Sequence, residues 1–195
     1  MKLYYSPGAC SLADHIALQE ADMKVDLVKV DLKTHKLEDG RSFLEINPKG
    51  YVPALQFDTG AVLTENVAIL TWIADEYHAL VPPGQFGRYR LLEMLAFIAS
   101  ELHKTFHPLF SPDATNTEKK AAAERVADKL AFVSTQFKGP YLFGPNASAA
   151  DPYLFVMLMW ARKNKIAIPD TLTAFSERMR SRPTVQAALK HEGLI

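Results

Sequence analysis

The chain contains a single cysteine, Cys10, among its 195 residues. One cysteine cannot form an internal disulfide, so we expect a protein that folds in a reducing compartment. Net charge is also absent, because 22 lysine and arginine residues balance 22 aspartate and glutamate residues. A neutral chain has no general attraction for the phosphate backbone of nucleic acids or for anionic lipid. We therefore expect no nucleic acid and no membrane surface as a partner.

Long apolar runs are missing as well. The longest uncharged apolar segment, 153–161, falls well short of the roughly 18 residues that a membrane-spanning helix needs. The apolar run 3–5 is too short for a secretory signal, so we expect a cytoplasmic protein. Hydrophobic residues make up 48% of the chain and charged residues 23%, which excludes a disordered or collagen-like chain.

The first part of the chain alternates strand and helix patterns. The patterns predict strands at 2–5, 25–32, 54–57 and 61–63, and helices at 11–20, 37–46 and 66–77. Asp58-Thr59-Gly60 is a short turn between two strands, so these strands should pair antiparallel. The order β, α, β, α, β, β, α predicts a small mixed sheet with an early parallel crossover and helices packed on it.

The second part of the chain is predicted to be all helical. Residues 80–87 are rich in proline and glycine, which is typical of a linker, so we expect domains at 1–79 and 88–195. After the linker, apolar residues recur on one helix face, first at Leu91, Leu95, Ile98 and Leu102, then at Val126, Leu130, Val133 and Phe137. Two further helices are expected at 151–163 and 172–179.

Cys10 is the first candidate for chemistry, since it stands between the first strand and a helix expected to start near Ser11. Ser11 and Asp14 fit a helix-capping pattern. The unpaired N–H groups and positive dipole at a helix start favour the thiolate, which is the nucleophilic form of cysteine. The alternative is an inert, buried thiol, which is what a lone cysteine usually is.

A strand, a cysteine at a helix start and Val52-Pro53 before another strand form the thioredoxin arrangement, with Cys10-Ser11 in place of a two-cysteine motif. At this point the chain resembles the glutathione transferases, and specifically the bacterial beta class. The segments that carry the resemblance run from end to end, at 4–12, 47–55, 63–69, 101–104, 150–155 and 192–194.

The resemblance implies a thioredoxin-like α/β domain that holds glutathione as co-substrate, an all-α domain that contributes the second-substrate pocket, and a homodimer. It implies conjugation of glutathione to small hydrophobic electrophiles, with thiol–disulfide exchange through Cys10 as an additional activity. Detoxification is the role that this chemistry suggests. The alternative is a non-catalytic redox sensor or ligand-binding protein on the same fold.

The resemblance also assigns residues to the binding of glutathione. The Val52 backbone would pair with the cysteinyl part, with Pro53 in the cis form; a trans proline at an edge strand is the alternative. Glu65 and Asn66 open a helix, so their N–H groups would receive the γ-glutamyl carboxylate while the Glu65 side chain takes the ammonium group. Alternatively, Glu65 only complements its own helix dipole.

In the long helix after the linker, His103 matches the beta-class histidine that hydrogen-bonds the sulfur, and Lys104 adds positive charge. Ser100 would reach toward Cys10 from the same face. A lone helical histidine is more often structural. His103 and His107 also have metal-ligand spacing, but no third ligand is identifiable, so we expect no metal.

Two positions depart from the class. His35 replaces a lysine that meets the glycine carboxylate of glutathione, so binding should strengthen on mild acidification. Ala96 replaces an asparagine, which removes one hydrogen bond near the thiol.

The remaining candidates have competing interpretations. Tyr5 matches a catalytic tyrosine of other classes, on which the beta class does not depend, and Ser11 either caps its helix or contacts the thiol. Around the second substrate we place Phe106, Phe110 and Trp160. The pattern at 148–151 is a capping box whose N-cap is either Ser148 or Asp151.

Overall fold

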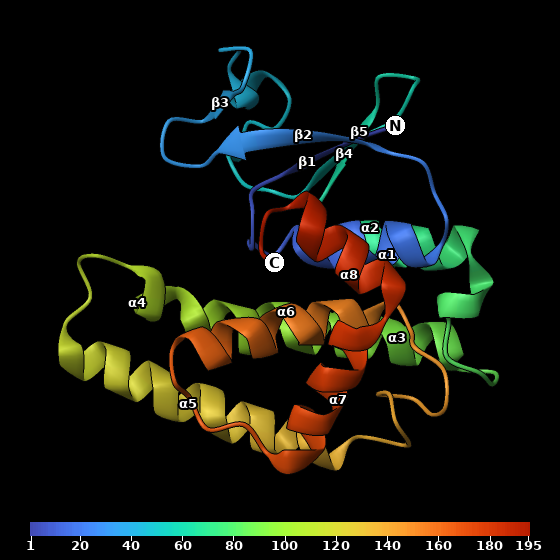
Figure 1. The fold of residues 1–195 in the computed structure, drawn as a ribbon, viewed down its shortest axis with the longest axis vertical. Helices are drawn as coiled ribbons and strands as arrows, with labels where there is room; N and C mark the ends of the chain where they lie inside the picture. Colours follow the sequence, from blue (N-terminus) through green and yellow to red (C-terminus); the bar gives the residue numbers. More distant parts are fainter.

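The computed structural model describes residues 1–195, and its first part is a five-stranded mixed sheet (Figure 1). The strand order is β3-β2-β1-β4-β5. The strands and the helices of this part are β1 (Lys2–Tyr5), α1 (Leu12–Glu20), β2 (Asp26–Asp31), β3 (Lys36–Leu37), β4 (Ala54–Gln56), β5 (Val62–Thr64) and α2 (Asn66–Glu76). The thioredoxin-like fold class is confirmed.

The strand pairing follows from the lengths of the connections. β1 runs parallel to β2, with Leu3 opposite Leu27, because α1 carries the chain back across the sheet between them. β4 and β5 are joined by a short turn and pair antiparallel, with Leu55 opposite Leu63. Both the parallel crossover and the closing hairpin are therefore as predicted.

The helix predicted at 37–46 is wrong. This segment contains β3 and one turn of 3₁₀ helix, η1 (Phe43–Glu45). The backbone turns back at Gly40, with Leu37 N–H donating to the Arg41 carbonyl, and Ser42 caps η1. Phe43 is fully buried against Tyr4, so one aromatic anchor holds the segment on the sheet where the weak apolar periodicity suggested a helix.

The second part is helical, as predicted. Its elements are η2 (His78–Leu80), α3 (Gly87–Phe97), η3 (Ile98–Leu102), η4 (His103–Phe106), α4 (His107–Phe110), α5 (Asn116–Thr135), α6 (Ala150–Lys163), α7 (Asp170–Ser181) and α8 (Pro183–His191). The four predicted face residues from Leu91 to Leu102 are fully buried. From α3 to α4 the chain is one continuous rod that changes to a π-helical turn at η3 and to 3₁₀ at η4. α8 was not predicted from the sequence.

The residue that caps α6 is Ala149, with no side-chain capping bond, so neither Ser148 nor Asp151 is the N-cap, although these two residues bond to each other at the start of the helix. The Ser148 hydroxyl accepts from Ala150 N–H and donates to Asp151, whose carboxylate accepts from Ser148 N–H at 2.7 Å and from Leu142 N–H. Burial raises the pKa of Asp151 to about 6. Reciprocal bonding of this kind satisfies the free donors at the start of a helix that is buried along most of its length.

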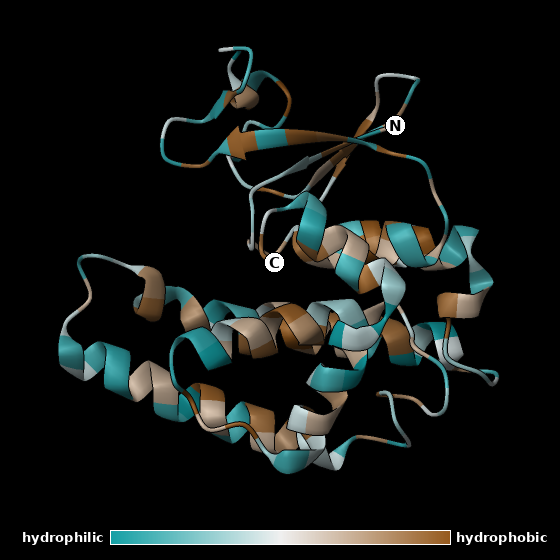
Figure 2. Ribbon diagram, viewed as in Figure 1, coloured by the Kyte–Doolittle hydropathy of each residue, from teal (hydrophilic) through white to brown (hydrophobic).

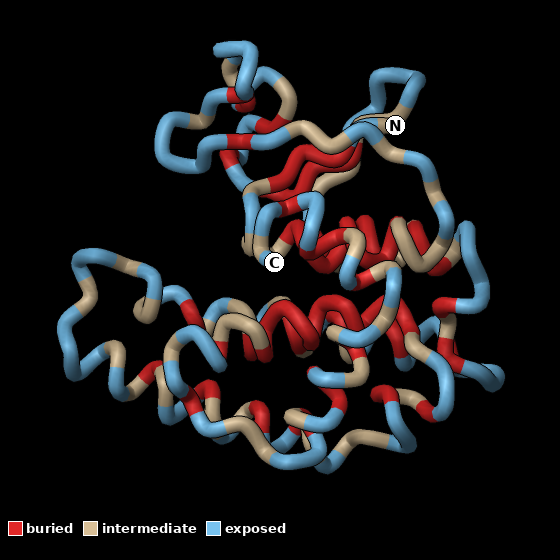
Figure 3. The backbone as a smooth tube through the Cα atoms, viewed as in Figure 1, coloured by how far each residue is buried: buried red, intermediate tan, exposed pale blue.

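The two parts pack through α1, which contacts α2, α6 and α8 (Figure 1). Buried residues, red in Figure 3, are concentrated in β1, β4, α1, α2 and α6. Figure 2 shows apolar residues, in brown, along the same central elements. One cluster of 39 buried residues draws from both parts, so they share a core. The exact domain bounds, 1–79 and 88–195, stay a prediction.

None of the helices combines the length and the apolar character that crossing a bilayer requires.

Candidate functional site

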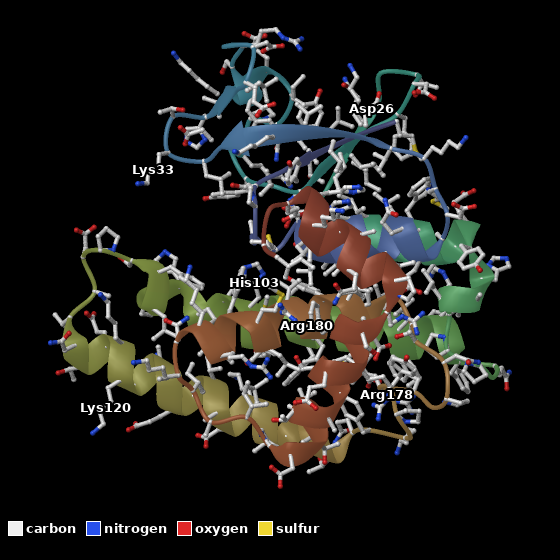
Figure 4. All side chains as sticks on the ribbon, viewed as in Figure 1. Asp26, Lys33, His103, Lys120, Arg178 and Arg180 are labelled. Atoms are coloured by element: carbon white, nitrogen blue, oxygen red, sulfur yellow. The ribbon has the colours of Figure 1, made fainter.

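A cavity of about 1480 Å³ lies where the loops of the sheet domain face the helical part. Figure 4 shows His103 at this junction. Eleven of the twelve residues that the sequence assigned to catalysis or binding line the cavity: Cys10, His35, Val52, Glu65, Asn66, Ser100, His103, Lys104, Phe106, Phe110 and Trp160. Tyr5 does not. It is 8% exposed and packs near His15, because alternate residues of β1 point to opposite faces of the sheet.

Cys10 lies at the base of the cavity, two residues before α1 begins. Its thiol donates to the Val52 carbonyl at 3.3 Å. The Val52–Pro53 bond is cis, as predicted, and it belongs to the segment that brings this carbonyl to the thiol. The segment after β1, which carries the cysteine, and the cis-proline segment before β4 therefore meet at the same end of two neighbouring antiparallel strands.

The expectation that the helix start would favour a Cys10 thiolate does not hold in this structure. Burial, together with the nearby Asp14 carboxyl, raises the pKa of the thiol to about 12. Backbone N–H groups of Cys10 and Ser11 act in the opposite direction but do not overcome burial. The thiol is therefore neutral at physiological pH, and it donates a hydrogen bond to the Val52 carbonyl.

The loop that carries Cys10 is held by the helical part of the chain. Trp160 Nε1 donates to the Gly8 carbonyl at 2.9 Å, and the Gly8 N–H donates to Glu192. The backbone N–H and the carbonyl of Gly8 are thus both hydrogen-bonded to side chains from distant helical segments. Ser11 is the N-cap residue of α1, as predicted, but its hydroxyl makes no capping bond and does not contact the thiol: it bonds to backbone groups of Ser6 in the same loop.

α2 begins at the cavity with Asn66, and Glu65 precedes it with a positive φ of 76°. The Glu65 carboxylate is 64% exposed and lies 2.6 Å from Lys49 Nζ. Asn66 is buried, and its side chain donates to the Cys10 carbonyl. The first N–H groups of α2 have no partner in the preceding turn of helix, so this end of α2 suits an anion.

His103 is fixed from both sides. Its Nδ1 lies 2.6 Å from the Tyr153 hydroxyl, and its ring meets Trp160 edge to face with centroids 5.0 Å apart. Burial lowers the pKa of His103 to about 4, so the ring is neutral. Tyr153 has no other partner and is satisfied by donating to Nδ1, which places the ring proton on Nε2. Tyr153 was not predicted, because it stands in a uniformly apolar helix.

Two neighbours of His103 behave differently from each other. Ser100 donates its hydroxyl to the Ala96 carbonyl of its own helix at 2.9 Å, so it lines the cavity without reaching toward Cys10. Lys104 is exposed at the cavity and makes no ion pair there.

His35 lies on the sheet side of the cavity with a positive φ of 52°. Its Nδ1 is buried without a hydrogen-bond partner. The ring rests on Gly50, where a Cβ atom would come within 2.8 Å of it, so only glycine leaves room for this ring position. His35 therefore occupies a constrained place in the lining rather than a free surface.

The helical side of the cavity is aromatic with a basic rim. Phe110 and Trp160 meet edge to face with centroids 5.0 Å apart, and Phe106 packs against both. Phe106 is fully buried, whereas Phe110 is 46% exposed. His107 and Lys163 also line the cavity, and neither was predicted as a substrate contact. No group of three or more His, Cys, Asp or Glu side chains is arranged to hold a metal ion.

The chain matches two family models, the glutathione S-transferase N-terminal domain over residues 9–76 and the glutathione S-transferase C-terminal domain over residues 100–192. It is 44% identical over 200 residues to glutathione S-transferase GstA of Escherichia coli O157:H7, with all of both chains covered.

Solved structures agree. The bacterial beta class glutathione S-transferase of Sphingomonas chungbukensis is 47% identical with a TM-score of 0.92, and a sphingomonad glutathione S-transferase complexed with glutathione is 48% identical with a TM-score of 0.91. Both comparisons cover 100% of each chain. With two family models matched and full-length identity of this order, the chain belongs to the glutathione S-transferase family.

Proposed function

We propose that this transferase binds glutathione in the cavity at Cys10 and conjugates its sulfur to small hydrophobic electrophiles. The observation that carries the proposal is the convergence, in one cavity, of a neutral thiol donor, the free start of α2 and a fixed neutral histidine. Each suits a different part of glutathione. The apolar wall of Phe106, Phe110 and Trp160 continues from them into space for a second substrate.

Glutathione would lie along the sheet side of the cavity. The γ-glutamyl carboxylate would accept from the backbone N–H of Asn66, and its ammonium group would replace Lys49 at Glu65. The Val52 backbone would pair with the cysteinyl part as an added strand does. Both His35 and Lys104 line the cavity. His35 would meet the glycine carboxylate of glutathione, and Lys104 would add positive charge near its sulfur.

The chemistry then follows from stabilising a sulfur anion. Bound glutathione gives up its thiol proton to solvent, and the sulfur attacks the electrophile while the leaving group departs with its electron pair. His103 Nε2–H would donate to that sulfur, and the Cys10 thiol would do so by turning its single proton away from the Val52 carbonyl, so each would stabilise negative charge on the sulfur. Because His103 is neutral it cannot supply a full positive charge, and its role is that of a hydrogen-bond donor.

The second candidate function is thiol–disulfide exchange through Cys10. Here the Cys10 sulfur would attack a glutathione disulfide, release one thiolate and carry a mixed disulfide that a second glutathione resolves. The position of the only thiol in the cavity favours this cycle. The raised pKa of that thiol disfavours it, since thiolate is the attacking form. We therefore place conjugation first.

Titration calorimetry with reduced glutathione, followed by turnover with a chlorodinitrobenzene, tests the proposal. We expect saturable binding and release of chloride with conjugate formation. Binding without turnover would instead favour a non-catalytic sensor or ligand-binding role. To separate the two enzymatic cycles, intact mass is measured after incubation with oxidised glutathione: we expect little adduct on the wild type at neutral pH, and none on Cys10→Ala.

We also propose a homodimer in the cytoplasm. The exposed aromatic residues Tyr51, Phe86 and Tyr89, between 63% and 71% exposed, support a further protein contact. The unpaired cysteine supports a reducing compartment. A monomer mass that does not change with concentration in sedimentation equilibrium would overturn the dimer.

A further inference from the structure

Asp14 is a buried acidic residue that the proposed chemistry does not use. It lies in the first turn of α1 and its side chain is fully buried. Its Oδ2 accepts from Asn66 Nδ2 at 2.8 Å, and its Oδ1 has no partner. No lysine, arginine or histidine forms an ion pair with it. A carboxyl group in such a place needs a reason, because burial without compensation is costly.

The Asn66 amide connects Asp14 to the site. Its nitrogen donates to Asp14 and also to the Cys10 carbonyl at 2.9 Å, so both amide protons are used. Asn66 is at the same time the first residue of α2, whose backbone N–H faces the cavity. One side chain therefore ties the segment before α1, which carries the thiol, to the start of α2.

The charge of Asp14 is set by its surroundings. The titratable groups that interact with Asp14 are Cys10, Tyr153 and Glu192, and its hydrogen-bond partner is Asn66. Burial raises the pKa of Asp14 well above its usual value, and the Glu192 carboxylate adds to the effect. An ionised Asp14 would in turn raise the pKa of Cys10 and Tyr153, opposing a sulfur anion in the cavity.

We propose that Asp14 is a positioning residue that acts as a neutral carboxyl group, holding Asn66 so that the start of α2 and the Cys10 segment keep a fixed relation for glutathione. The inference rests on the glutathione site proposed above. It adds that the Asn66 side chain does not contact the ligand. Only the backbone of Asn66 does, and Asp14 sets its place.

Replacing Asp14 separates these roles. Asp14→Ala removes the acceptor and should raise the KM for glutathione about tenfold, the value of roughly one buried hydrogen bond, with little change in kcat. The effect falls on KM because α2 holds the γ-glutamyl group equally in the ground state and the transition state. Asp14→Asn keeps an acceptor but cannot ionise, so at pH 6.5 it should restore KM to within a factor of two to three of the wild type.

The asparagine variant also has a pH signature. As pH rises, Asp14 ionises in the wild type, whereas the asparagine of Asp14→Asn cannot. If the two KM values for glutathione differ at high pH, the KM of Asp14→Asn should therefore be the lower one. Asn66→Ala should raise KM as Asp14→Ala does, and the double variant should cost no more than Asn66→Ala alone. The matched control is Asp26→Asn, an exposed acid that Figure 4 places away from His103, which should leave KM unchanged.

Three results would overturn the inference. They are an unchanged KM in Asp14→Ala or in Asn66→Ala, an Asp14→Asn variant as weak as Asp14→Ala at pH 6.5, or additive effects in the double variant. Asn66→Ala keeps the test valid if Asp14→Ala fails to fold. Calorimetry of the wild type with reduced glutathione is a separate arm: absence of binding there would overturn the proposed function itself.

Discussion

The two sides of the cavity offer different kinds of group to a ligand. On the sheet side, the groups proposed for glutathione are mainly backbone atoms, at Val52 and at the start of α2, fixed by the cis-proline segment and by buried polar bonds. On the helical side they are side chains, with aromatic rings packed edge to face on Trp160 and exposed lysines in the lining. Backbone atoms stay in place when side chains are substituted, so backbone contacts suit a ligand that is always the same. A single substitution changes a side-chain contact and can therefore change which ligand is bound. The comparison suggests that the sheet side sets affinity for glutathione and the helical side selects the electrophile.

The largest expected effect is on the sheet side. Glu65→Ala should lower kcat/KM roughly 100-fold, because it removes a charge-assisted bond to the ammonium group of glutathione. Steady-state kinetics with varied glutathione measures this. Glu76→Ala, at the exposed far end of α2, is the matched control. A Glu65→Ala enzyme as active as that control would remove the proposed ammonium contact.

The junction between the two sides should give the next largest effect. His103→Phe should lower kcat on the order of thirtyfold, since one donor to the sulfur anion is lost. Because the pKa of His103 is about 4, the imidazole stays neutral above pH 5, so no limb of the wild-type profile from pH 6 to 9 should come from its titration. If such a limb is present in the wild type and absent from His103→Gln, then His103 acts in its charged form and the donor account fails.

A substitution on the helical side should leave glutathione unaffected. Phe110→Ala should raise the KM for an aromatic electrophile about fivefold through lost apolar contact, while the KM for glutathione changes less than twofold. The measurement is a pair of saturation curves, each with the other substrate held saturating. Phe132→Ala, an exposed phenylalanine on α5 outside the cavity lining, is the control. Equal effects on both substrates would contradict the division of labour between the two sides.

The smallest effect concerns His35. His35→Ala should bind glutathione about two to three times more weakly, because it removes the side chain proposed to meet the glycine carboxylate. Binding is measured by calorimetry. An unchanged affinity would show that His35 does not meet the glycine carboxylate.

The sequence predicted the elements of the sheet domain well where turn chemistry was explicit. Asp58-Thr59-Gly60 marked the hairpin, and the joint match of the segments around Val52-Pro53 marked the cis bond. It failed at 37–46, where weak apolar periodicity hid a segment anchored by Phe43. Short irregular segments are held by tertiary contacts, which local patterns do not encode.

Within the site, residue positions were predictable but side-chain directions were not. Ser100 and Asn66 both line the cavity, yet each turns its polar group to a partner in the protein. The protonation state of Cys10 depends on its burial and on the nearby Asp14, and neither follows from spacing along the chain. Tyr153 was missed for the same reason: only the folded structure places its hydroxyl against His103.

In the proposed reaction the reactive sulfur belongs to glutathione and not to Cys10. The ultraviolet thiolate absorbance of the wild type at neutral pH tests this assignment, with the protein saturated either with glutathione or with S-methylglutathione, whose sulfur cannot ionise. We expect a thiolate band with glutathione and none with S-methylglutathione, because the Cys10 thiol is neutral in this site. A band of equal size with S-methylglutathione, or before any ligand is added, would instead assign the thiolate to Cys10.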